Sequence, residues 1–114
     1  MKEKNRELQY LRRLIYLDVS EAATHIADVS ARTWHRWEEG TRKVPADILN
    51  KTQDIVDQYV ELVMDGKESN PLCQYFDSFD LFHKETGAGV IEWRLAQAVS
   101  AGKYAKEEFG LIYD

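Results

Sequence analysis

The stretch VSARTWHRWEEGTRKVP, residues 29–45, contains two tryptophans, four Lys and Arg side chains and two adjacent acids. Ser30 is a favourable helix N-cap because its hydroxyl can accept a hydrogen bond from a free backbone amide. Gly40 has no Cβ and suits the left-handed conformation that often ends a helix. These two signals predict a short helix over residues 31–39.

The predicted helix has two different faces. Trp34 and Trp37 lie three positions apart and project together, so they are predicted to anchor the helix to the core. The opposite, solvent-facing stripe holds Arg32, His35, Arg36 and Glu39. A short helix with aromatic anchors can hold its outward side chains rigidly, as base recognition in the DNA major groove requires. Arg32, His35 and Arg36 are therefore predicted to contact bases.

Other side chains near this helix suit contacts with the DNA backbone. The Ser30 hydroxyl and the first amides of the helix can bind a phosphate. The basic loop after the helix would lie along the neighbouring strand. The predicted backbone contacts are Ser30, Thr33, Thr41, Arg42 and Lys43. Glu38 is instead expected to pair with a basic side chain of a helix predicted near the N-terminus, over residues 5–17.

Further helices are predicted on both sides of this stretch. Apolar spacing predicts a first helix over residues 5–17. Asp18 with Glu21 forms an acidic variant of the capping box, which predicts a second helix over residues 19–27. A long apolar stripe predicts a helix over residues 46–64. Together these elements predict a helix-turn-helix bundle.

The chain changes character after the long helix. The breakers in DGKESNPL divide a predicted DNA-binding domain, residues 1–65, from a C-terminal dimerisation region, residues 66–114. LCQYF, residues 72–76, is predicted to form a short strand. VIEW, residues 90–93, either continues a second strand or begins the last helix. The predicted fold class is mainly α, with an N-terminal helix-turn-helix bundle followed by a small C-terminal α+β region.

The last helix supplies candidates for a dimer interface. One of its faces holds Ile91, Leu95, Val99 and Gly102. A glycine inside a helix costs about 1 kcal/mol relative to alanine, which indicates close packing against another helix. That helix can belong to the same chain or to a second copy. A homodimer is expected because helix-turn-helix dimers place two recognition helices roughly 34 to 36 Å apart on the duplex.

Charge is unevenly distributed along the 114 residues, which carry a net charge of -5. Residues 1–45 contain nine Lys and Arg against seven acids, whereas residues 46–114 contain six against thirteen. The first part can face phosphates and the second cannot do so broadly. This distribution is compatible with a localised nucleic-acid site and excludes a large basic groove.

The single cysteine, Cys73, fits a reducing compartment. The N-terminal MKEKNRELQYLRR is charged where a secretion signal would be apolar. No apolar run approaches the roughly 20 residues that span a bilayer. A cytoplasmic protein without membrane contact is expected.

Two blocks of sequence carry a resemblance to a known family. The two short helices and the ending WEEG-R-VP resemble helix-turn-helix proteins of the phage-repressor (Xre/Cro) type. LDVSEAATHIADVSARTWHRWEEG, residues 17–40, together with VIEWRLAQAVSA, residues 90–101, resembles the anti-CRISPR-associated (Aca) repressors of the second type. One departure is visible, because the turn ADVS has no glycine and is one residue longer than usual, which predicts a slightly re-aimed recognition helix.

The resemblance implies a function and a base-reading residue. Members of that family bind, as dimers, an inverted repeat in the promoter of a short phage operon, and they repress that operon. It implies that Arg32 is the base-reading arginine, that the partner is double-stranded DNA, and that RNA carrying the same repeat is a further candidate partner. The residues themselves do not decide whether RNA is bound.

Other classes of function receive less support. His25, His83 and Cys73 lack partners at metal-ligand spacing, and no nucleophile elbow or dinucleotide loop is present. No enzyme activity, metal or cofactor is expected. Two alternatives stay open: an antitoxin whose acidic half neutralises a toxin, and an interaction module that does not bind DNA.

Overall fold

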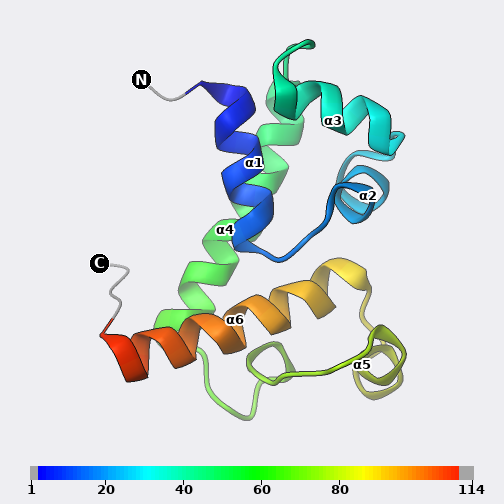
Figure 1. Cartoon of the computed structure of the whole chain (residues 1–114). Coiled ribbons are helices and arrows are strands. Elements are labelled where there is room, and N and C mark those ends of the chain that lie inside the picture. The colour runs from blue at the N-terminus through cyan, green and yellow to red at the C-terminus, as the bar shows by residue number, and fades with distance from the viewer. Residues whose placement is uncertain (1–2, 111–114) are drawn as a thin grey trace. The chain divides into compact units, whose positions relative to one another are not determined.

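A computed structural model describes residues 3–110 of the chain, and every regular element within that range is a helix (Figure 1). In chain order the elements are α1 (Lys4–Leu14), α2 (Val19–Ala22), the π-helix η1 (Ala23–Ala27), α3 (Ala31–Glu39), α4 (Ala46–Asp65), the 3-10 helix η2 (Pro71–Cys73), α5 (Phe79–Thr86) and α6 (Val90–Phe109). The chain divides into two units, Met1–Val56 and Asp57–Asp114, and α4 contributes to both.

The first unit places α1, α2, α3 and the beginning of α4 around one apolar core. The buried side chains of this core are Leu8, Ile15, Leu17, Ala22, Ala23, Ile26, Trp34, Trp37, Val44, Ile48, Leu49 and Val56. A hydrogen bond from Gln53 Nε2 to Glu7 Oε1, 2.8 Å long, also joins α4 to α1. The core therefore collects residues from α1, α2, α3 and the first part of α4.

The turn between α1 and α2 is determined by the predicted capping box. Asp18 Oδ1 accepts from Glu21 N at 2.8 Å, and Glu21 Oε1 accepts from Asp18 N at 3.1 Å, which confirms the prediction. α1 ends at Leu14, earlier than predicted. The reason is that Tyr16 adopts a positive φ of 65° and Asp18 is extended, so the helix cannot continue into the cap.

The second predicted helix is regular only in its first turn. From Ala23 to Ala27 it becomes a π-helix, and the amides of both Asp28 and Val29 donate to the carbonyl of Ala23. Asp28 then adopts a left-handed φ of 52°, which short polar residues tolerate. The π turn and the left-handed Asp28 together lead the chain to Ser30, the N-cap of α3.

The predicted α+β region after residue 65 is wrong, because residues 66–110 form no strand. Leu72 and Cys73 of LCQYF belong to the 3-10 helix η2, and VIEW forms the first turn of α6. The carbonyl of Phe76 accepts from Trp93 Nε1 at 2.9 Å and from Gln97 Nε2 at 3.1 Å. Side chains of α6 thus satisfy a backbone group that a strand would have offered to a neighbouring strand. The description "mainly α" holds.

In the second unit, α6 packs closely against the last part of α4. The buried apolar side chains of the second unit are Tyr59, Val63, Phe82, Leu95, Ala96, Ala98 and Val99. A Cβ on Gly102 would lie 2.8 Å from Val63 Cγ2 and 2.9 Å from Tyr59 Oη. A side chain at Gly102 would therefore press against Val63, which cannot easily move because a branched side chain is stiff at χ1.

We predict that Gly102→Ala destabilises the protein by about 1 to 3 kcal/mol, because overpacking outweighs the gain of about 1 kcal/mol in helix propensity. Urea unfolding measures the change. Ala101→Gly, at an exposed position of the same helix, is the matched control and should cost about 1 kcal/mol through propensity alone. A more stable Gly102→Ala variant would show that the helices separate freely.

Candidate nucleic-acid interface

α3 begins and ends where the sequence predicts. Ser30 Oγ accepts from the amide of Thr33 at 3.2 Å, so Ser30 is the N-cap. Gly40 is the C-cap with a left-handed φ of 86°, and its amide donates to the carbonyl of Arg36. The amides of Thr41 and Arg42 donate to the same carbonyl at 3.1 and 3.2 Å. Both ends of this short helix are therefore secured by local hydrogen bonds.

The inward face of α3 is aromatic and buried. Trp34 is 0% exposed and Trp37 is 7% exposed, and their ring centroids lie 5.6 Å apart. Indole rings supply a large apolar area and few rotatable bonds. A helix of this length cannot be stable alone, so the two rings account for much of its attachment to the first unit.

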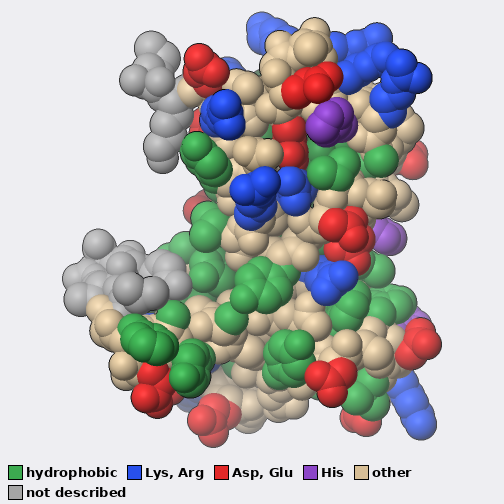
Figure 2. All heavy atoms as spheres, in the orientation of Figure 1, with side chains coloured by type: hydrophobic (Ala, Val, Ile, Leu, Met, Phe, Trp, Pro, Cys, Tyr) green, Lys and Arg blue, Asp and Glu red, His purple; other side chains and the backbone are tan. Residues whose placement is uncertain are grey.

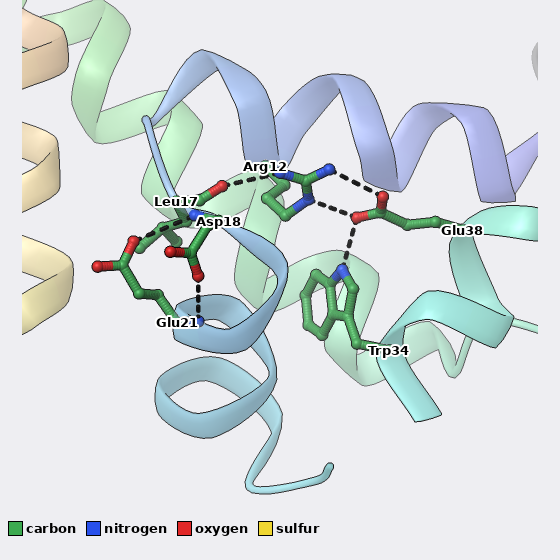
Figure 3. Close-up of polar contacts among 6 residues, drawn as sticks. All are labelled: Arg12, Leu17, Asp18, Glu21, Trp34 and Glu38. Carbon is green, nitrogen blue, oxygen red and sulfur yellow. Dashed lines mark hydrogen bonds and ion pairs between the residues drawn. The ribbon is translucent and has the colours of Figure 1, made fainter. Parts of the chain in front are cut away.

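A buried ion pair also holds α3 against α1. Arg12 Nε donates to Glu38 Oε2 at 2.6 Å, and Nη2 donates to Oε1 at 2.9 Å. The remaining nitrogen, Nη1, donates to the Leu17 carbonyl at 2.9 Å. The indole N–H of Trp34 donates to Glu38 Oε2 at 2.6 Å. Figure 3 shows the guanidinium of Arg12 between Leu17 and Glu38. The expected pairing of Glu38 with the first helix is confirmed.

The ionised form of Glu38 is favoured in the folded protein. Burial by itself would raise the pKa of this carboxyl. Hydrogen bonds from Arg12 and Trp34, with the positive charge of Arg12, outweigh burial and hold the pKa below its ordinary value. The network is therefore fully formed when Glu38 carries a negative charge.

The outward face of α3 presents polar side chains to solvent. Arg32 and His35 are exposed, and Arg36 and Thr33 are half-buried. His35 Nε2 lies 3.3 Å from the carboxylate of Glu39 one turn later, and both side chains remain largely accessible. The structure thus brings the three predicted base-reading residues to one side of one helix, away from the tryptophans.

The predicted backbone contacts lie at the two ends of α3. Ser30 precedes the helix, and its hydroxyl lies 3.1 Å from the Thr33 hydroxyl. Thr41 follows the helix, and its hydroxyl donates to Glu39 Oε1 at 3.0 Å. Arg42 and Lys43 come next in the loop and are both exposed. Figure 2 shows Lys and Arg side chains gathered in the part of the view where Figure 1 places α1, α3 and the start of α4.

The start of α1 lies beside the end of α3, which the sequence did not predict. Asn5 Nδ2 donates to the Glu38 carbonyl at 3.3 Å, across 33 positions of sequence. A groove of about 290 Å³ runs between the two helices and is lined by Asn5, Arg6, Gln9, His35, Glu38 and Glu39. The charged N-terminal segment was visible in the sequence, but its place beside α3 depends on tertiary packing.

The four candidates for a dimer interface all lie on α6. Leu95 and Val99 are buried within the second unit, at 1% and 0% exposed. Gly102 is buried too and faces α4, and Ile91 is half-buried. The large apolar side chains that this unit exposes to solvent are instead Tyr75, Leu81, Tyr104 and Phe109.

Residues 3–110 contain no group of three or more His, Cys, Asp and Glu side chains that could hold a metal ion. None of the helices in the same range combines the length and apolar character needed to cross a bilayer.

Comparison with known proteins agrees with the resemblance found in the sequence. A family model described as Aca2/YdiL-like matches residues 3–111. The chain is 37% identical over 116 residues to the Aca2 repressor of Pectobacterium phage ZF40, with 95% of this chain and 98% of that protein covered. It is 25% identical over 109 residues to the uncharacterized protein YdiL of Escherichia coli (strain K12), with 89% and 92% covered. The phage relative supports a repressor or regulator role.

We predict that the Arg12–Glu38 pair behaves as one unit in unfolding experiments. Glu38→Ala alone should cost about 3 to 5 kcal/mol, because it leaves the buried guanidinium without its partner. The double variant Arg12→Met/Glu38→Leu should cost less than Glu38→Ala, since it buries no unpaired charge. Urea unfolding of Arg12→Met, Glu38→Leu and the double variant gives the coupling energy. Additive costs would contradict a coupled pair.

Protein stability should also depend on pH through Glu38. Because the pKa of Glu38 is lowered by folding, its contribution is complete above the ordinary value of 4.5 and is lost as pH falls through the folded pKa. The unfolding free energy should therefore fall less steeply with acidification in Glu38→Gln than in the natural sequence. Glu85→Gln, at an exposed position, should keep the natural slope. Equal slopes in all three proteins would exclude this contribution.

Proposed function

Because this chain belongs to the Aca2/YdiL-like family, we propose that it is a sequence-specific transcriptional repressor that binds double-stranded DNA. The observation that carries the proposal is the division of α3 into two faces. Trp34, Trp37 and Glu38 are buried, whereas Arg32 and His35 are exposed. A helix fixed by one face and polar on the other has the form of a recognition helix.

Arg32 is the proposed main base-reading residue. It lies in the first turn of α3, and the N-terminal residues of a recognition helix are those that contact base edges. A guanidinium can donate two parallel hydrogen bonds to guanine O6 and N7, a pairing that discriminates among bases in the major groove. His35 and Arg36 follow on the same side of the helix and would extend the contact along the groove.

Backbone contacts would hold α3 in register on the duplex. The exposed cations Arg42 and Lys43 lie directly after the helix and are placed to meet phosphates of the flanking strand. Ser30 and Thr33 supply hydroxyl groups at the opposite end, with Thr41 beside the loop. These contacts carry little sequence information but supply much of the affinity.

Two copies of the chain would be needed for tight binding to an inverted repeat. One recognition helix contacts few bases, and a symmetric dimer doubles the contact on a symmetric operator. Residues 57–114 contain five Lys and Arg against eleven acids, so this unit is poorly suited to face DNA. We therefore assign dimerisation to the second unit. The proposed operator lies upstream of the protein's own gene, in an anti-CRISPR operon of a phage.

The proposal predicts that Arg32→Ala weakens operator binding by about 1 to 3 kcal/mol and relaxes specificity at one position per half-site. A gel shift on the DNA upstream of the gene, titrated with salt, measures both effects. RNA carrying the same repeat is tested in parallel. Unchanged operator affinity in Arg32→Ala would mean that another residue reads the base.

Lys43→Ala is the matched control for Arg32→Ala, because it removes one positive charge from the same surface. It should weaken binding to all DNA sequences equally and make the salt slope shallower by about one unit per half-site. If the natural protein binds no DNA at low salt, the repressor proposal fails and an interaction module replaces it.

A further inference from the structure

A small pocket lies where the first turn of α1 meets the end of α3. It has a volume of about 170 Å³ and is lined by Lys4, Asn5, Gly40, Arg42, Lys43 and Val44. Three of these side chains are cations and none is acidic. The cations come from two segments about 40 positions apart in sequence, so the charge gathers here only when the first unit folds.

The geometry of Asn5 and Gly40 keeps the two segments together. Asn5 donates its side-chain amide to the carbonyl of Glu38, two residues before Gly40. A Cβ on Gly40 would lie 3.2 Å from Asn5 Nδ2, and the φ of Gly40 is 86°. A residue with a side chain would be strained there and would crowd the amide. Lys4, next to Asn5, is therefore held near the loop that carries Arg42 and Lys43.

The three cations have no acidic partner within the described chain. The ion pairs between described residues involve other side chains, and Lys4, Arg42 and Lys43 are all exposed. Like charges that share a pocket without a counter-charge repel one another and favour binding of an anion. A phosphate, with several acceptor oxygens, matches a set of Lys and Arg donors from different directions.

We propose that Lys4, Arg42 and Lys43 form a single binding site for one phosphate of the DNA backbone beside each half-site. This inference rests on the proposed DNA binding and adds α1 to the DNA-contacting surface. Lys4 thereby couples the position of α1 to the strand that flanks the groove. The site would act on all sequences alike, because phosphates carry no base identity.

The first test compares Lys4→Ala with the natural protein in DNA-binding titrations over a range of salt, on operator and on unrelated DNA. Lys4→Ala should lower both affinities by the same factor and make the slope of log K against log salt shallower by at most about 0.9 per half-site, because Arg42 and Lys43 remain beside the same phosphate. Lys4→Arg should restore the slope. Lys51→Ala, an exposed lysine of α4 outside the pocket, is the charge-matched control and should change the slope less.

The second test places single neutral methylphosphonates at successive positions of the operator half-site. At one position, neutralising the phosphate should lower the affinity of the natural protein by a larger factor than it lowers the affinity of Lys4→Ala. Equal losses in both proteins at every position would overturn the proposal. The proposal would also be overturned if Lys4→Ala had the same salt slope as the natural protein while Lys43→Ala had a shallower one.

A free anion is the other source of the same chemistry. Inorganic phosphate, added without DNA and followed by amide chemical shifts of residues 40–44, is the probe for that case. Saturable binding of inorganic phosphate, with a normal DNA salt slope in Lys4→Ala, would identify a free-anion pocket and overturn the proposal. Absence of DNA binding by the natural protein would instead reject the repressor function itself.

Discussion

The buried ion pair between Arg12 and Glu38 is the contact on which the placement of α3 depends. Its guanidinium joins α3 to α1 through Glu38 and to the turn before α2 through the Leu17 carbonyl. The same carboxylate binds the indole of Trp34. Three segments of the helix-turn-helix therefore meet at one charged centre. A rotation of α3 about its own axis would break at least one charge-assisted hydrogen bond, whereas apolar packing alone tolerates small adjustments.

A buried charge pair is not an efficient source of stability, since removing two ions from water costs about as much as their attraction returns. Its benefit here is geometric. Bidentate contact between Arg12 and Glu38 has one favourable arrangement, and that arrangement turns Arg32 and His35 outward. Base recognition by an arginine tolerates little displacement. We infer that the pair is used for orientation and that the tryptophans supply the apolar contribution.

Local signals in the sequence predicted the elements around this centre well. Ser30, Gly40 and the Asp18–Glu21 box act through neighbours three or four positions away, so their pattern is visible without the fold. Non-local features were missed. The LCQYF segment has strand-like composition, but its Phe76 carbonyl is satisfied by Trp93 and Gln97 of α6, contacts that no local pattern reveals. The approach of Asn5 to the end of α3 was invisible for the same reason.

The acidic character of the second unit complements this localised surface. Non-specific DNA binding is driven almost entirely by phosphate contacts, whereas specific binding adds contacts with bases. Under the proposed function, the acidic side chains on residues 57–114 would disfavour approach of DNA to that part of the chain, which would restrict binding to the surface that carries Arg32. The overall charge of -5 would thus lower affinity for unrelated DNA, which depends on phosphate contacts. For the proposed repressor, which would select one operator among many competing sites, the ratio of specific to non-specific affinity matters more than affinity alone.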